Sequence, residues 1–351
     1  MIKKVTKLGY LTGPLSKSKD ILTEKEAIST DLGMPIYDYD NKIEYYMFGD
    51  SFSIVPDANA LRPGEGAIWH SNFVGRAINS NFEQGVEFQQ VACPAIEGDH
   101  YWPTGDVDRY VKDTTKIPTG GVVVDGVLYV YYFSITEWNG WKIRYNGLIK
   151  STDRGETFVS VPSVNFIDER LLYDTFGGQT KLCYVPTYSD KRFDYIVAPN
   201  FKQVNVCRDK DDSALLYIYG IGNGRATSAR LARVRQENIE NLNEYEFYVG
   251  CDSVGNAVWS KGKTGALKLI DNEYAIAIDG AVGELCVSYN DYVGKYMATY
   301  LCYLGELGQS YITVRFSDKP YGKFGEKYEI TSGDKNSDIN NIYGGFTAPF
   351  M

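Results

Sequence analysis

Short runs of apolar and aromatic residues recur along the whole chain, and helical periodicity is almost absent. Each run ends in a turn rich in Gly, Asn, Asp or Ser, which is typical of β-strands. The clearest runs are residues 43–49, 127–133, 193–198, 215–219 and 295–300. Only residues 18–26 and 236–246 favour short helices. The pattern therefore predicts an all-β fold.

The composition agrees with an all-β fold and excludes several classes of partner. Among 351 residues there are 29 Tyr and 35 Gly, which favour strands and tight turns. The formal net charge is −9 and no basic run occurs, so we expect no nucleic-acid partner. No apolar stretch approaches the roughly 18 residues of a membrane helix, so we expect no membrane insertion. Nothing in the sequence indicates an oligomeric state.

Histidine and cysteine usage argues against metal and cofactor chemistry. The two histidines, His70 and His100, leave little room for a His-based metal site or a histidine-centred triad. The six cysteines form no CxxC pair, although Cys286 and Cys302 could face each other on neighbouring strands. We expect no metal and no cofactor.

The N-terminus has two lysines but no apolar region after them, so we predict no signal peptide. This favours a cytoplasmic or virion-associated protein, or an extracellular one if a signal has been removed.

One turn motif indicates how the strands are arranged. Residues 151–158 read Ser-Thr-Asp-Arg-Gly-Glu-Thr-Phe, which resembles the Asp-box hairpin of sialidase-like propellers. In such a hairpin Ser and Asp side chains bind turn amides, and Gly takes the left-handed conformation. We interpret Asp153 as structural. Dividing 351 residues by about 70 per blade predicts five blades, and no linker divides the chain.

Two motifs near the N-terminus are more specific. Thr30-Asp31-Leu32-Gly33 is followed by Phe48-Gly49-Asp50-Ser51. Further motifs follow in order: Ser71-Asn72, residues 117–121, Gly222-Asn223-Gly224-Arg225, residues 283–287 and residues 342–346. These motifs occur in the same order in the domain-of-unknown-function 4185 (DUF4185) family, which the chain resembles from about residue 28 to the end. It departs from that family's usual ending, where a His precedes the final Pro, because Ala348 precedes Pro349 here.

The resemblance implies a fold and an activity. DUF4185 proteins are five-bladed propellers related in outline to furanosidase propellers, and some are endo-D-arabinanases of glycoside hydrolase family 183. We therefore expect a lead-in segment, residues 1–27, and a single five-bladed β-propeller, residues 28–351. The expected function is endo-acting hydrolysis of a furanose-containing polysaccharide, with D-arabinan as the leading substrate. The alternative is a non-catalytic carbohydrate-binding propeller, such as a phage tail receptor-binding or surface recognition module.

Three acidic residues are candidates for the chemistry. Hydrolysis of a glycosidic bond usually needs two carboxyl groups, one as proton donor and one as base or nucleophile. Asp31 precedes a strand-like run, Asp50 ends an apolar aromatic run, and Glu284 lies within an apolar run. We predict Asp31 and Asp50 as the principal pair and Glu284 as proton donor or pKa modulator. Equally, Asp31 could be a turn residue, Asp50 could bind backbone amides, and Glu284 could pair with Arg225.

Five residues are predicted to contact the sugar. Directional hydrogen-bond donors and an aromatic face are the groups that bind sugar hydroxyls and C–H surfaces. The predicted contacts are His70, Asn72, Thr119, Trp138 and Arg225.

Overall fold

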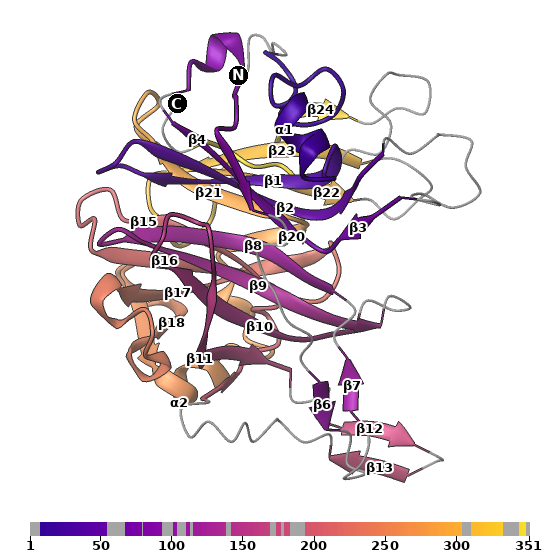
Figure 1. The fold of residues 1–351 in the computed structure, drawn as a ribbon. Coiled ribbons are helices and arrows are strands. Elements are labelled where there is room, and N and C mark those ends of the chain that lie inside the picture. Colours follow the sequence, from indigo (N-terminus) through magenta and orange to yellow (C-terminus); the bar gives the residue numbers. More distant parts are fainter. Residues whose placement is uncertain are drawn as a thin grey trace.

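The computed structural model describes twelve ranges of the chain. They are residues 8–54, 67–78, 80–92, 101–103, 110–112, 115–137, 142–168, 173–176, 179–182, 194–303, 310–332 and 344–348. Trp138 lies outside the described residues. The chain is almost entirely β, as its pattern of short runs predicts (Figure 1).

Four large antiparallel sheets follow one another along the sequence. The first contains β1 (Ser29–Asp38), β2 (Ile43–Phe52), β4 (Phe73–Ile78) and β5 (Gln90–Ala92), with β3 (Trp69–His70) paired to β2. The second contains β8 (Thr115–Val124), β9 (Val127–Glu137), β10 (Lys142–Ser151) and β11 (Val159–Ile167), with β14 (Ile196–Val197) added in parallel to β11. The third contains β15 (Gln203–Arg208), β16 (Leu215–Ile221), β17 (Thr227–Arg235), β18 (Glu246–Cys251) and β19 (Ala257–Lys261), with β20 (Ile278–Val282) paired to β17. The fourth contains β21 (Leu285–Asn290), β22 (Lys295–Tyr303), β23 (Ser310–Ser317) and β24 (Tyr328–Ser332).

The remaining elements are small. Two helices, α1 (Lys19–Glu24) and α2 (Gly262–Leu267), and two hairpins lie outside the four sheets; the hairpins are β6 (Tyr101–Pro103) with β7 (Tyr110–Lys112), and β12 (Tyr173–Phe176) with β13 (Gln179–Leu182). Helix α1 confirms the helix predicted over residues 18–26, and its Leu22 packs against Phe48, Phe73 and Phe88 of the first sheet. The helix predicted over residues 236–246 was wrong: two single 3-10 turns, Gln236–Asn238 and Leu242–Glu244, occupy it.

The four sheets form a propeller, arranged in a ring around a common axis. The first strand of each sheet is the innermost, since β1 contacts β8, β8 contacts β15, and β15 contacts β21. Separate apolar clusters fill the spaces between the first and second, second and third, and third and fourth sheets. This face-to-face packing of successive sheets is the packing of a propeller, and the other face of the first sheet packs against α1.

The C-terminal segment lies between the fourth and first sheets. The Thr299 hydroxyl donates to the Gly345 carbonyl oxygen, with an Oγ1···O distance of 2.7 Å. Phe346 packs against the cluster shared by the first and second sheets, whereas Thr347 contacts Cys286 and Ser288 on β21. Residues 344–348 therefore join the end of the chain to its beginning.

The prediction of five blades was wrong, because the described residues form four. Dividing the length by a fixed blade size assumed that every residue belongs to a four-stranded blade. Here the third sheet takes six strands, and the two small hairpins and the segment containing α1 use further residues. Sequence pattern locates strands, but it does not show which strands share a sheet.

The turn over residues 151–158 has the hydrogen bonds that its sequence predicts. The amide of Gly155 donates to Ser151 Oγ at 2.8 Å, and the amide of Thr157 donates to Asp153 Oδ1 at 2.9 Å. Gly155 is in the left-handed region, with φ +82°. These contacts, and its hydroxyl bonds to Ser151 and Thr157, hold the pKa of Asp153 at about 2 despite the opposing effect of desolvation. Asp153 is thus part of a turn.

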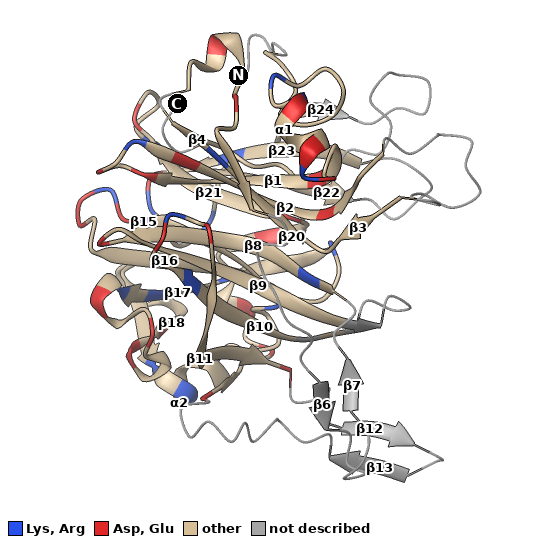
Figure 2. Cartoon of the chain, in the orientation of Figure 1, with Lys and Arg blue, Asp and Glu red and all other residues tan. Residues whose placement is uncertain are grey.

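The suggested Cys286–Cys302 pair is not formed. Cys286 on β21 faces Thr299, and Cys302 on β22 faces Tyr311, so the two cysteines are out of register. Both are free, buried thiols. Acidic and basic residues are interspersed over the turns around the ring (Figure 2). In the part of the chain that the structure describes, none of the helices has the length and hydropathy needed to cross a bilayer.

Candidate active site

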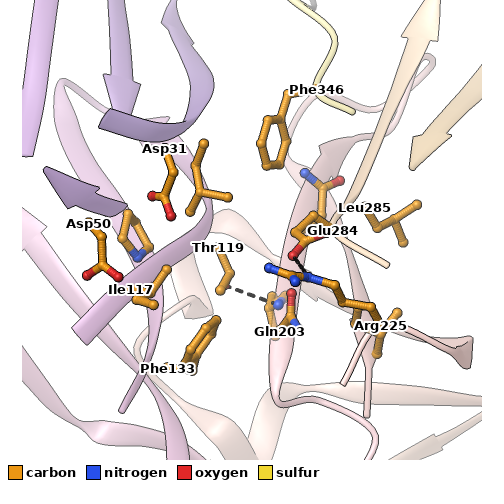
Figure 3. Close-up of a pocket in the computed structure, with 15 residues that line it drawn as sticks. Asp31, Asp50, Ile117, Thr119, Phe133, Gln203, Arg225, Glu284, Leu285 and Phe346 are labelled. Atoms are coloured by element: carbon orange, nitrogen blue, oxygen red, sulfur yellow. Dashed lines mark hydrogen bonds and ion pairs between the residues drawn. The ribbon is translucent and has the colours of Figure 1, made fainter. Parts of the chain in front are cut away.

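A pocket of about 230 Å³ opens where the inner strands of all four sheets begin. We call it the carboxylate pocket, because Asp31, Asp50 and Glu284 all line it. Asp31 and Asp50 lie on one wall, and Glu284 with Arg225 lies on the facing wall (Figure 3). All three acids predicted from the sequence are therefore brought together, although Glu284 is more than 230 residues from Asp50.

Strand pairing apposes the two N-terminal motifs. Thr30 pairs with Ser51 and Leu32 with Phe48, so an irregularity in the β1–β2 register places Asp31 opposite Gly49 and Asp50. Leu32 and Gly33 both have positive φ, +65° and +101°. A positive φ is uncommon for a non-glycine residue such as Leu32. It occurs where a local distortion of the backbone changes the direction of a side chain. The local distortion is what turns Asp31 into the pocket.

The absence of a side chain at Gly49 creates the space for Asp31. A Cβ atom built on Gly49 would lie 2.4 Å from Asp31 Oδ1 and 3.1 Å from Leu32 Cδ1. Real Cβ atoms do not approach an oxygen so closely, so any larger residue would displace the carboxylate. The glycine of the Phe48-Gly49-Asp50-Ser51 motif therefore serves Asp31, its neighbour across the sheet.

We expect Gly49→Ala to lower kcat/KM by about 100-fold, since displacing a reacting group by about 1 Å can cost that much. We expect only a small change in the thermal unfolding temperature, because the displaced Asp31 carboxylate can move into the open pocket. The control is Gly9→Ala, where the added Cβ would meet its nearest neighbour at an ordinary 3.8 Å. Equal activity of the two variants would show that Gly49 does not position Asp31.

Asp50 is in an environment that favours its protonated form. Burial raises the pKa of Asp50, and a hydrogen bond from Trp69 opposes this effect. The indole Nε1 of Trp69 donates to Asp50 Oδ1 at 3.1 Å, and Trp69 is 42% exposed. A carboxyl group with a raised pKa is suited to donate a proton.

Glu284 forms an ion pair with Arg225 on the facing wall. Arg225 Nε donates to Glu284 Oε1 at 2.5 Å, and Glu284 is only 7% exposed. The other carboxylate oxygen, Oε2, is buried and has no hydrogen-bond partner among the described residues. The ion pair that was an alternative for Glu284 is therefore present, and it leaves one oxygen available inside the site.

Thr119 lines the pocket, but its hydroxyl joins two sheets. It accepts from the Val204 amide at 3.1 Å and from Asn146 Nδ2 at 3.4 Å, and it donates to the Tyr131 carbonyl oxygen. These three bonds use the full capacity of a hydroxyl group. Thr119 thus holds the second and third sheets together beneath the pocket.

The other predicted sugar contacts lie elsewhere. Asn72 is completely buried outside the pocket lining, and its Nδ2 donates to the Lys116 carbonyl oxygen at 3.0 Å. Its sequence position next to Ser71 could not reveal this role in joining the first and second sheets. His70 is half-buried on β3 beside Ser51, and it does not line the pocket. Arg225 does line the pocket.

With this geometry in place, the chain can be compared with known proteins. The family model described as "Domain of unknown function (DUF4185)" matches residues 18–351. The chain belongs to the DUF4185 family. No curated protein matches it by sequence.

Solved structures share the fold of this DUF4185 chain at low sequence identity. A protein from Bacteroides ovatus named as a candidate hydrolase is 15% identical, with a TM-score of 0.52 over 91% of this chain and 74% of that chain. Two weaker matches have TM-scores of 0.41: the Bacillus subtilis arabinanase (10% identity, 88% of this chain and 84% of that chain) and the Bacillus licheniformis endo-arabinanase (11%, 88% and 81%). The Bacteroides ovatus match shows that the DUF4185 chain shares the overall fold of that protein.

Two residues of the site were missed in the sequence of this DUF4185 protein. Trp69 directly precedes His70, and pairing of Phe52 with Trp69 brings it beside Asp50. Phe346 extends from the C-terminal segment into the pocket between the two walls (Figure 3). Phe346 belongs to the closing Gly-Gly-Phe motif, but only the tertiary path of the chain end shows why an aromatic residue stands there.

The described residues contain no group of three or more His, Cys, Asp or Glu side chains that could hold a metal ion.

Proposed function

We propose that this DUF4185 protein is a glycoside hydrolase that cleaves a furanose-containing polysaccharide, with D-arabinan as the substrate and an endo mode of action. The observation that carries the proposal is the convergence of Asp31, Asp50 and Glu284 on one pocket. Two carboxyl groups that flank a bond are the usual requirement for glycoside hydrolysis. The choice of D-arabinan rests on the sequence resemblance to endo-D-arabinanases of the same family.

The environments of the three acids support different roles. Burial raises the pKa of Asp50, so Asp50 is the proton donor to the leaving oxygen. Asp31 is the second carboxylate, which takes the proton of the attacking water or attacks the anomeric carbon itself. As the anomeric C–O bond breaks, the bonding electrons pass to the leaving oxygen, which takes the Asp50 proton. Glu284, which forms an ion pair with Arg225, faces the sugar ring and stabilises the positive charge that develops on it.

The direct test is product formation from polysaccharides. Purified protein is incubated with D-arabinan, L-arabinan and galactan, and the products are separated by size. We expect oligosaccharides of mixed length from D-arabinan alone, which is the pattern of endo cleavage. Binding to one polymer without release of any product would instead identify the protein as a carbohydrate-recognition module.

The assignment of Asp50 as the acid is tested by Trp69→Phe. Phenylalanine keeps an aromatic ring but loses the N–H group that stabilises the charged form of Asp50. The pKa of Asp50 should therefore rise, and the acid should stay protonated to higher pH. We expect the alkaline limb of the pH profile of kcat/KM to move to higher pH while the acidic limb stays in place. Movement of the acidic limb alone would show that Asp50 acts as the base.

A further inference from the structure

A second pocket lies at the other end of the inner strands. The carboxylate pocket is lined by the beginnings of the inner strands, whereas a larger pocket of about 880 Å³ is lined by their ends. We call this larger space the opposite pocket. Asn205 lines both pockets, and the C-terminal segment lies between them, with Phe346 in one and Thr347 in the other. The volume is within the range of pockets that bind small organic ligands.

Tyrosine side chains line two sides of the opposite pocket. Tyr37 and Tyr39, on β1 and the turn after it, form an edge-to-face pair with ring centroids 4.7 Å apart. Tyr289 lies at the end of β21, and its ring contacts that of Tyr296 at 5.2 Å. Tyr39 is 55% exposed. Exposed tyrosine rings in a concave site offer apolar faces together with polar tips.

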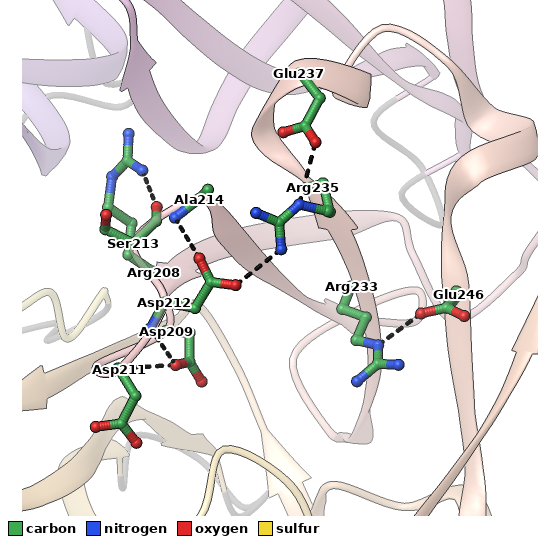
Figure 4. Close-up of polar contacts among 10 residues, drawn as sticks. All are labelled: Arg208, Asp209, Asp211, Asp212, Ser213, Ala214, Arg233, Arg235, Glu237 and Glu246. Carbon is green, nitrogen blue, oxygen red and sulfur yellow. Dashed lines mark hydrogen bonds and ion pairs between the residues drawn. The ribbon is translucent and has the colours of Figure 1, made fainter.

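Arg208 lies in this pocket and forms no ion pair with a carboxylate of the described residues. Its guanidinium donates to the carbonyl oxygens of Val123 and Ser213, and to Gln236 Oε1 at 3.0 Å (Figure 4 shows the contact with Ser213). These contacts use both protons of Nη1 and one of Nη2. The Nε proton and the second Nη2 proton have no partner among the described residues, so two directional donors remain in a fixed position.

The charges in the opposite pocket disfavour an anionic ligand. Five carboxylates, of Asp38, Asp40, Asp125, Asp209 and Asp291, line it together with the two cations Arg208 and Lys210. Lys210 is already paired with Asp211, at 2.6 Å. Asp38 and Asp209 accept hydrogen bonds from nearby amides, which leaves Asp40, Asp125 and Asp291 exposed at the rim as acceptors.

We propose that the opposite pocket is a second carbohydrate-binding site, which takes a neutral oligosaccharide. Tyrosine faces contact the C–H surface of the sugar rings. The rim carboxylates accept from sugar hydroxyls, and Arg208 donates to a hydroxyl or ring oxygen. Because Asp31, Asp50 and Glu284 do not line the opposite pocket, a chain bound there is not cleaved but keeps the protein on a long polymer.

A metal ion or an anion fits this pocket less well. None of the groups of His, Cys, Asp and Glu in the described part of the chain could hold a metal ion. A phosphate or a carboxylate would have to approach Arg208 past the acidic rim, where like charges repel it.

The test is a calorimetric titration of the full-length Asp50→Asn protein with D-arabinan oligosaccharides of four to six residues. This choice of probe rests on the proposed function. We expect two binding events per chain. Tyr39→Ala should weaken one of them by about tenfold or more, while Tyr39→Phe, which keeps the ring, should leave both nearly unchanged. The matched control is Tyr274→Ala, since Tyr274 is 86% exposed and lies outside both pockets.

The outcomes separate this proposal from the proposed function. A single binding event, unaffected by Tyr39→Ala, overturns the second site whether or not the wild-type protein cleaves D-arabinan. Cleavage by the wild-type protein with one binding event leaves the hydrolase in place and removes only the second site. Binding that Tyr39→Ala weakens, in a wild-type protein that cleaves nothing, removes the hydrolase and keeps the site. Unchanged unfolding temperatures would show that each variant is folded.

Discussion

The Asp50→Asn variant is expected to lose turnover of D-arabinan by roughly 10²- to 10⁴-fold, the usual contribution of a general acid. Asparagine has nearly the same shape as aspartate, and its amide cannot supply a proton to the leaving oxygen. The measurement is kcat from reducing ends released over time, at the pH optimum of the parent protein.

The same substitution should leave stability unchanged or slightly higher. Burial disfavours the charged form of Asp50, as its raised pKa shows, so a neutral side chain removes a cost of folding. The control is Asp318→Asn, which changes a carboxylate that is 80% exposed and pairs with Lys295 at the surface. That variant should keep full activity. A fully active Asp50→Asn protein would contradict the role of Asp50.

Lys202→Met is expected to lower the free energy of unfolding by about 3–5 kcal/mol, because it removes the buried cation that forms an ion pair with the Asp168 carboxylate. Lys202 Nζ lies 3.1 Å from Asp168 Oδ2, and both side chains are only 5% exposed. Lys202 Nζ also donates to the Ile143 carbonyl oxygen, at 3.3 Å. The measurement is urea-induced unfolding, followed by the change in tryptophan fluorescence.

This ion pair lies behind the wall of the carboxylate pocket. The Lys202 carbonyl oxygen accepts from Asn146 Nδ2, and the same amide group reaches the Thr119 hydroxyl. The informative control is the double variant Lys202→Met with Asp168→Leu, which removes both charges and should recover most of the stability. A double variant as unstable as the single one would show that packing, and not the unpaired charge, explains the loss.

Much of the fold could be predicted from local pattern. Alternating apolar and aromatic runs located β2, β9, β16 and β22, and the polar turn motif at residues 151–158 has the expected hydrogen bonds. These features depend on contacts within a few residues, so a single sequence contains the information. The number of blades depends on which strands pair across long distances in the sequence. The prediction of five blades was therefore wrong, and the described residues form four large sheets.

The residues of the candidate site could likewise be predicted only in part from the sequence. Asp31, Asp50 and Glu284 could be predicted as candidate catalytic residues because each is an acid next to or inside an apolar run. The motifs that contain them also follow one another in the order found in the DUF4185 family. Asn72 and Thr119 also stood in family motifs, yet their polar groups join neighbouring sheets. A motif marks a position as special without showing whether its side chain faces a ligand or another part of the chain.

The sequence by itself determined where the strands lie and which acids are available, because burial patterns and turn chemistry act locally. Only the tertiary structure decided that Gly49 makes room for Asp31, that Trp69 donates to Asp50, and that Arg225 forms an ion pair with Glu284. The first two contacts join residues on different strands, and the third joins the turn between β16 and β17 to the turn before β21. Their distances are set by strand register and by the closure of the ring, which are properties of the whole chain.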